Sequence, residues 1–150
     1  MIMKAELNRE VIWCLRALAQ NADIQRELYP TFVVVADELV LDFDEAYSDY
    51  KAYHQTQHAD LDNLDTHIAS KSGILEFWTD EALDDSEFWS EIRNLAKKAL
   101  ISRNLTTFAP HPSTGTFVSA SETWTAGSSE FHQSNSKPAS VVARLLKLFR

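Results

Sequence analysis

The chain has 150 residues, enough for one domain with a sizeable hydrophobic core, and its 45% content of hydrophobic residues excludes a wholly disordered protein. Its three glycines and four prolines are too few for most all-β folds, which need more turn residues. The net charge of −8 repels nucleic acid and attracts basic partners. We therefore predict an all-α fold, an irregular bundle of four to five helices, with an acidic helical domain over residues 1–105.

The first helix is predicted to run from about Lys4 to Gln20. Apolar residues recur there at three- and four-residue spacing, as on the buried face of a helix: Leu7, Val11, Cys14, Leu15 and Leu18. Asn21 is expected to end this helix. Asp23 is expected to cap a short second helical segment that ends before Pro30.

A long helix is predicted to follow, from Pro30 to about His58, because proline suits the first turn of a helix. At 100° per residue, ten apolar or aromatic residues fall within one arc of about 140°. That arc is the predicted core face: Phe32, Val35, Ala36, Leu39, Val40, Phe43, Ala46, Tyr47, Tyr50 and Tyr53. Alternatively, residues 31–43 form two strands, because β-branched residues favour strands. The Asp37-Glu38 pair between them lacks the glycine that a tight hairpin needs, so we favour the helix.

Further helical segments are predicted up to residue 105. Over residues 60–73 three apolar residues share a helical face, and Gly73 is a good stop. A helical turn or two is predicted over residues 74–83. The last helix is expected to begin after a capping-box-like pair, Asp84 and Glu87. The apolar residues predicted to be buried by these segments are Leu61, Leu64, Ile68, Phe88, Ile92, Leu95, Ala96, Ala99 and Leu100.

The composition changes after residue 105. Residues 106–138 are rich in serine, threonine, glycine and proline and have no sustained period, which predicts a loosely ordered linker or arm. Residues 139–150 are predicted to form a short basic amphipathic helix that carries Arg144, Lys147 and Arg150. This helix could bind a membrane surface or a partner, or fold back onto the acidic domain.

Two stretches of the sequence resemble a known group of proteins. These are LYP…ADELVLDFDEAY and, further along the chain, FWTDEAL…FWSEIRNLAKKAL. Together they resemble a group of small, acidic, uncharacterised bacterial proteins, over residues 27–100. The resemblance implies a helical fold and a bacterial cytoplasmic origin, and it transfers no catalytic residues.

The common catalytic signatures are absent from the sequence, including the glycine-rich phosphate loops, C-x-x-C, H-E-x-x-H and G-x-S-x-G. The one cysteine, Cys14, lies on the predicted apolar face of the first helix, where a thiol is normally inert. We therefore favour a protein that is not an enzyme and has no cofactor.

The sequence also bears on location. The charges of Arg9, Glu10 and Arg16 do not fit a signal peptide, and no apolar run approaches the ~18 residues of a membrane span. A single cysteine cannot form an internal disulfide. We expect a cytoplasmic protein with a reduced thiol.

One set of residues has metal-ligand spacing. His54, His58 and Asp62 are four residues apart and would point the same way on one continuous helix. A di-iron bundle would need glutamate three residues before a histidine on two helices, and neither His54 nor His67 has one. His54 is expected on the core face as a hydrogen-bonded histidine. We therefore predict no metal site and keep a metal-dependent enzyme or sensor as an alternative.

The densest acidic stretch covers residues 36–50, with six acids and no base. On a helix these acids form two stripes with Leu41 between them, on the side opposite the core. Either a second element of the chain covers Leu41, or a partner does. A second acidic stretch, residues 76–91, surrounds aromatic residues that suit either a binding hot spot or a core. The predicted partner-binding residues are Asp37, Glu38, Leu41, Asp42, Asp44, Glu45, Asp49, Trp78, Asp80 and Glu81.

These patterns favour a non-catalytic acidic protein that covers a basic surface of a protein partner, such as an immunity or inhibitor protein for a bacterial toxin. Leu41 would be the central apolar anchor of that surface. We expect no direct contact with nucleic acid and no membrane span. The other alternative is a helical scaffold subunit that pairs with itself as a homo-oligomer.

Overall fold

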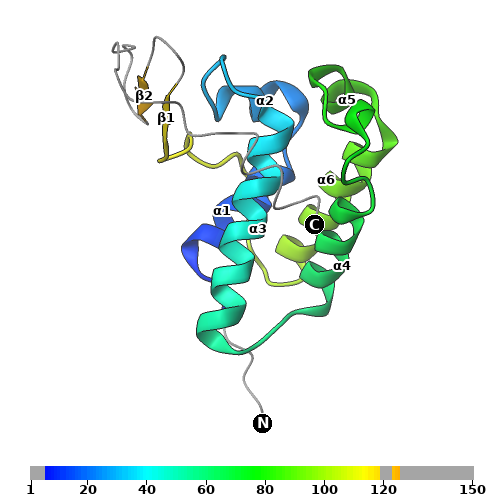
Figure 1. Ribbon diagram of the computed structural model, residues 1–150. Helices are drawn as coiled ribbons and strands as arrows, with labels where there is room; N and C mark the ends of the chain where they lie inside the picture. Colours follow the sequence, from blue (N-terminus) through cyan, green and yellow to red (C-terminus); the bar gives the residue numbers. More distant parts are fainter. Residues whose placement is uncertain (1–5, 119–122, 126–150) are drawn as a thin grey trace.

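The computed structural model describes residues 6–118 and 123–125. The helices are α1 (Arg9–Leu18), α2 (Ala22–Glu27), α3 (Val35–His54), α4 (Ala59–Ala69), α5 (Asp80–Asp85) and α6 (Glu87–Ile101), with a 3-10 turn η1 (Leu75–Phe77) before α5 (Figure 1). Beyond α6, β1 (Thr116–Val118) pairs antiparallel with β2 (Thr123–Thr125). The all-α prediction is confirmed, and this short strand pair is an addition to it.

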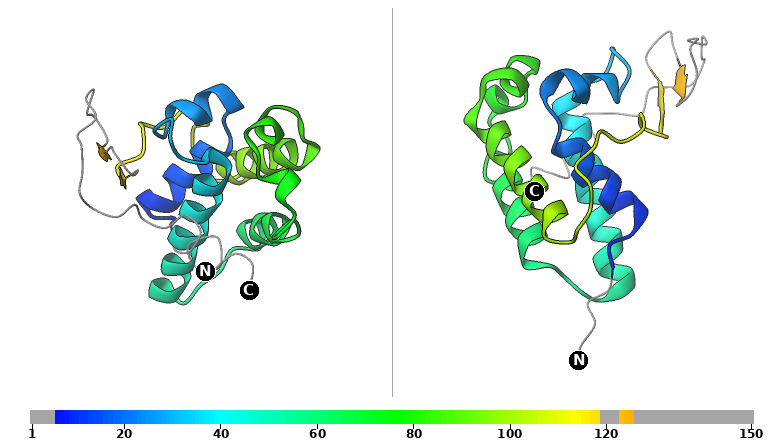
Figure 2. Two further views of the ribbon diagram at one scale, coloured as in Figure 1. Left: turned by 45° about the horizontal axis from the view of Figure 1, so that its top comes forward. Right: turned by 180° about the vertical axis from the view of Figure 1, so that it is seen from behind.

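The helices pack around α1. This helix lies against both α3 and α6, and α4 packs along α6 on the other side (Figure 2). The largest fully buried side chains come from all the long helices: Trp89, Tyr47, Tyr50, Phe43, Leu15, Leu18, Leu39, Leu61, Leu64, Leu83, Ile92 and Leu100. The predicted apolar faces of α1, α4 and α6 are therefore confirmed, with Leu95 only partly buried.

Side-chain caps fix where α2 and α6 begin. The Asn21 side chain accepts the Ile24 N–H at 3.0 Å and starts α2, so Asn21 is the cap that we had assigned to Asp23. The Ser86 hydroxyl accepts the Trp89 N–H at 3.1 Å and starts α6. The predicted Asp84–Glu87 capping pair is therefore wrong, and it fails because Ser86 supplies the better-placed acceptor.

Residues 31–43 are not a hairpin, because α3 is continuous from Val35 to His54. The helix is shorter than predicted at both ends: residues 30–34 form a turn, and Gln55 adopts a left-handed conformation with φ of 50°. The core face also ends early. Tyr53 is 85% exposed and His54 is exposed, so the predicted burial of these two residues is wrong.

One arginine links four segments of the fold. Arg93 on α6 donates hydrogen bonds to the Gln20 carbonyl after α1, the Gln25 side chain on α2 and the Leu83 carbonyl on α5, at 2.9, 2.9 and 2.6 Å. Gln25 is fully buried and donates in turn to the carbonyls of Ala17 and Leu18. The end of α1, the start of α2 and α5 are therefore held at fixed distances from α6.

We expect Arg93→Ala to lower the free energy of unfolding by about 2–4 kcal/mol, because three acceptors in the interior lose a charged donor. Denaturant titration followed by circular dichroism measures the change. Lys97→Ala, an exposed residue of the same helix, is the control and should stay within about 0.5 kcal/mol of the wild type. Equal stability of the two variants would contradict the linking role of Arg93.

Candidate functional site

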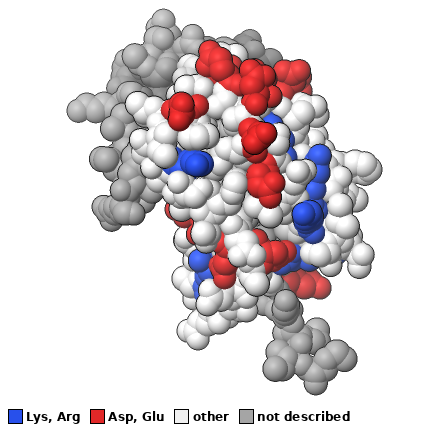
Figure 3. Space-filling model, turned by 90° about the vertical axis from the view of Figure 1, so that its right-hand side faces the viewer, with Lys and Arg blue, Asp and Glu red and all other residues white. Residues whose placement is uncertain are grey.

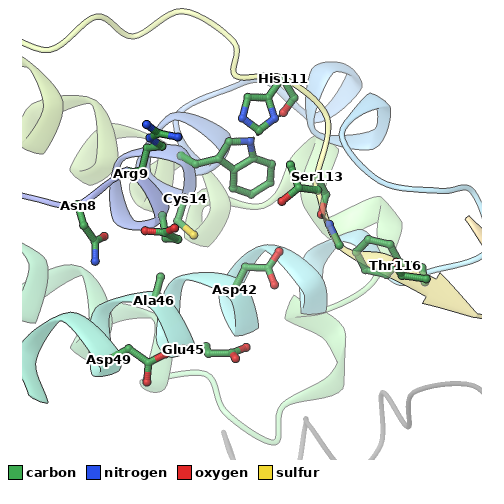
Figure 4. Close-up of a pocket in the computed structure, with 15 residues that line it drawn as sticks. Asn8, Arg9, Cys14, Asp42, Glu45, Ala46, Asp49, His111, Ser113 and Thr116 are labelled. Atoms are coloured by element: carbon green, nitrogen blue, oxygen red, sulfur yellow. Dashed lines mark hydrogen bonds between the residues drawn. The ribbon is translucent and has the colours of Figure 1, made fainter. Parts of the chain in front are cut away.

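A groove of about 680 Å³ lies between α1, α3 and the segment 111–117. Figure 4 shows Asp42, Glu45 and Asp49 along α3 on one side and His111 and Ser113 on the other. Trp13 and Cys14 of α1 also line it. Three separate parts of the chain therefore contribute to one concave surface.

The lining of the groove is strongly acidic. Glu10 comes from α1, and Asp42, Glu45 and Asp49 form one stripe on α3, at positions that lie on one helical face. Arg9 is the one basic residue among those that line the groove. Three of the predicted binding residues are thus brought together, and Glu10 is an acid that the sequence analysis did not include.

The acids converge on Cys14. This thiol is 4% exposed, and its pKa is raised well above the usual value, mainly by burial and then by the charges of Asp42, Glu10 and Glu45. Carboxylates from two helices therefore act on the same point. The groove has a negative potential, and the neutral thiol at its floor adds no charge of its own.

A buried tyrosine orients one of the carboxylates. The Tyr29 hydroxyl donates to Asp42 Oδ2 at 2.6 Å. Burial, followed by the charge of Asp42, raises the pKa of Tyr29 well above its usual value, so the phenol remains a donor. Asp42 is consequently held in one orientation at the edge of the groove.

The second wall of the groove is the segment after α6. Its carbonyls accept hydrogen bonds from side chains of α1 and of the turn that follows it. Trp13 Nε1–H donates to His111, Arg16 to Thr106 and Gln20 to Thr107, at 2.8, 3.0 and 2.9 Å. Residues 106–117 therefore belong to the folded domain, although we had predicted a loose arm from residue 106. The later part of that arm and the predicted basic helix over 139–150 lie outside the described residues.

Two further contacts hold this wall against the residues that follow α2. The Ser113 N–H donates to the Leu28 carbonyl at 2.9 Å. The rings of Tyr29 and Phe117 meet edge to face with centroids 5.7 Å apart. No sequence signal could have identified this wall, because most of its bonds use backbone atoms.

Leu41 is buried, with 4% of its surface exposed. The chain itself covers Leu41, and the prediction of a central apolar anchor at this residue is wrong. α3 packs against both α1 and α5, although Leu41 itself is not part of the main cluster of buried hydrophobic residues. The early turns of α3 therefore have little solvent-facing side.

The other acids of this stretch, Glu38 of the first stripe and both acids of the second, are also largely hidden. Asp37 and Glu38 are 4% and 1% exposed, and Asp44 is half-buried, so they do not form the rim that we predicted. Within the described residues, Asp37 Oδ1 has no hydrogen-bond partner. Burial and the charge of Glu38 raise the pKa of Asp37 to about 6. This carboxylate is a cost to the fold at neutral pH, since the fold favours its protonated form.

The second acidic stretch has a buried centre. Trp78 is 6% exposed, its Nε1–H donates to the Lys71 carbonyl at 2.9 Å, and it packs against Phe88 and Trp89. The core interpretation therefore holds for Trp78. Asp80 and Glu81 are exposed, and Figure 3 shows acids gathered toward this end of the molecule.

An arginine side chain of the protein already forms ion pairs with part of that second acidic surface. Arg26 of α2 makes ion pairs with Asp23, Asp80 and Asp84 at 3.3, 3.0 and 2.9 Å. Asp80 is thus committed to a contact between α2 and α5. The groove is the better candidate for a binding site because its acids surround a hollow.

The three residues with metal-ligand spacing, His54, His58 and Asp62, do not share a helix. α3 ends at His54, and His58 is the residue before α4, so the four-residue spacing has no helical meaning here. His58 is buried against the Tyr50 hydroxyl, at 3.1 Å from Nε2, and Asp62 accepts a bond from Tyr47 at 2.7 Å. Over residues 6–118, no group of three or more potential ligands could hold a metal.

A second hollow of about 680 Å³ lies beside His58, Asp60 and Arg103. Arg103 forms two bonds with the Asp60 carboxylate, at 2.6 and 2.9 Å, and this bidentate pair lowers the pKa of Asp60. The charges of Arg103 and Asp60 therefore offset each other, which leaves Glu6 as the other acid of the lining. Neither the arginine nor the aspartate is available as a distinctive ligand-binding group.

None of the helices that the structure describes has the length and apolar character required to cross a lipid bilayer. Comparison of the chain with protein families, with curated proteins and with solved structures finds no match. The resemblance to small acidic bacterial proteins therefore stays a prediction.

We expect Asp37→Asn to stabilise the protein at neutral pH. The folded pKa of about 6 lies above the unfolded value, so the contribution of Asp37 is fully present below about pH 4 and is lost as pH rises through 6. The variant should unfold with a free energy about 1–3 kcal/mol higher than the wild type at pH 8, and about equal at pH 4. Denaturant titrations at the two pH values test this expectation.

Asp85→Asn is the matched control, because Asp85 is exposed. It should change stability by less than about 0.5 kcal/mol at either pH. A loss of stability in Asp37→Asn at pH 8 would mean that the Asp37 carboxylate forms a favourable interaction in the native protein.

Proposed function

We propose that this chain is a non-catalytic protein that binds a basic protein partner through the acidic groove. The observation that supports this most strongly is the convergence of Glu10, Asp42 and Glu45 around Cys14, in a hollow with aromatic walls. An inhibitor or immunity protein for a bacterial toxin is the kind of protein that needs such a surface, since it must cover a basic site on its target.

The chemistry of the groove fits association better than catalysis. Cys14 is the one nucleophile of the thiol type, and its raised pKa keeps it protonated and unreactive. Tyr29 is similarly held as a neutral donor to Asp42. A fixed array of carboxylates accelerates the encounter with a positively charged protein and selects against acidic ones.

The interface would combine two kinds of contact. The exposed acids Glu45 and Asp49 form the rim, where charges mainly determine the rate of association. Trp13, Cys14 and Phe117 provide less polar surface inside the groove, where contacts mainly determine how long a complex lasts. This arrangement replaces the interface centred on Leu41.

We expect the paired change Glu45→Lys with Asp49→Lys to reduce the association rate constant of a captured partner about tenfold at low salt, and to weaken its dependence on salt. The partner is captured from a lysate of the source organism on immobilised wild-type protein, identified, purified and then measured by surface plasmon resonance.

The control is Glu81→Lys with Glu91→Lys. It changes the net charge equally and alters two exposed acids outside the groove. A wild-type association rate in the control together with a reduced rate in the groove variant supports the proposal. Equal rates in the two variants would show that only overall charge matters, and the groove would not be the interface.

A further inference from the structure

We infer that the partner inserts an arginine side chain into the acidic groove, with its guanidinium beside Trp13 and between the carboxylates of Glu10, Asp42 and Glu45. The inference rests on the proposed function and specifies the chemistry of the anchor residue. Four features of the groove lead to it: a fixed aromatic ring, carboxylates from two helices, a neutral floor and a suitable volume.

The aromatic ring is Trp13, which lines the groove and is half-buried. Its indole Nε1–H donates to the His111 carbonyl at 2.8 Å, and the Tyr29 ring meets it edge-on at an interplanar angle of 88°. Both contacts restrict rotation of the indole. A ring that is already ordered loses little entropy when a ligand stacks on it.

The carboxylates approach the same region from different directions. Glu10 belongs to α1, while Asp42 and Glu45 belong to α3, and the charges of all three raise the pKa of the Cys14 thiol between the helices. Asp42 is held by the Tyr29 hydroxyl at 2.6 Å. A cation placed above Cys14 would therefore be within the field of three carboxylates, one of which has a fixed orientation.

The floor of the groove neither repels nor neutralises a cation. Cys14 is 4% exposed and lines the groove, and its raised pKa keeps the thiol neutral. The volume of about 680 Å³ is ample for a long side chain with its stem. An apolar stem and a cationic head suit a site with an indole wall and acidic edges.

Arginine fits this combination better than lysine. Its planar guanidinium stacks on an indole and presents several N–H donors in one plane, so it can bond carboxylates on different sides while it contacts the ring. A lysine ammonium is a compact, strongly hydrated charge that gains less from a flat aromatic surface. A groove with carboxylates alone would accept both residues equally well.

The test uses three synthetic peptides of equal length on the full chain: octaarginine, octalysine and uncharged octacitrulline. Affinities are measured by isothermal titration calorimetry at low ionic strength. We expect octaarginine to bind about fivefold more tightly than octalysine, which corresponds to the added stacking of one guanidinium on tryptophan, and octacitrulline not to bind. The indole N–H signal of Trp13, assigned by its loss in Trp13→Phe, should shift on adding octaarginine.

Two variants separate the contributions of ring and charge. Trp13→Leu should reduce the ratio of the two affinities to about one and leave octalysine binding nearly unchanged. Glu10→Gln with Glu45→Gln should weaken both peptides, while the control Glu81→Gln with Glu91→Gln should bind as the wild type does. Because Trp13 also anchors His111, circular dichroism of Trp13→Leu checks the fold, and Trp13→Phe, which retains a ring, should keep part of the preference for arginine.

Each result has a distinct meaning. Equal affinity for octaarginine and octalysine, lowered for both by loss of Glu10 and Glu45, would overturn the arginine inference and leave the proposed function standing. A preference for arginine that persists in Trp13→Leu would overturn it as well. Binding of octaarginine with no shift of the Trp13 signal, or no binding at all, would exclude the groove as an arginine site, and the partner kinetics above would then decide the proposed function independently.

Discussion

The relative positions of α1, α2, α5 and α6 depend on one charged donor that lies between them. Arg93 reaches from α6 into the junction of α1 and α2 and across to α5, and it bonds two backbone carbonyls and the Gln25 amide oxygen. Partial burial lowers its pKa, yet the guanidinium has acceptors around it that compensate for lost water. Helix ends leave carbonyls unsatisfied, and one arginine meets that need for two segments at once.

The shape of the groove also depends on this junction between α1 and α2. Arg93 and Gln25 fix the end of α1, and α1 carries Glu10, Trp13 and Cys14 toward α3. The acids of α3 face these residues because α1 packs along α3 in a fixed position. A small change in the α1–α2 junction would therefore move one row of carboxylates relative to the other.

The helices could be predicted from the sequence because the spacing of apolar residues along a helix is a local property of the chain. Leu61, Leu64 and Ile68 show this on α4, where all three are buried as predicted. Helix ends were less readable, since several polar residues near each end could cap it and only Asn21 and Ser86 do so for α2 and α6. The same distinction applies to the acids. The charge of residues 36–50 could be read from the sequence, but the burial of Asp37 and Glu38 depends on tertiary packing, which a helical wheel does not describe.

The wall of the groove has a consequence for the order of events during synthesis. The hydrogen bond from Trp13 to His111 joins residues 98 positions apart, and the bonds from Arg16 and Gln20 span 90 and 87 positions. Contacts of such long range form late, because the intervening chain must first be ordered. On the ribosome helices α1–α6 can pack before residues 106–117 emerge, so we expect the groove to form after these helices have packed. The concave surface that we propose as a binding site would then be completed only after the helices that form its other sides.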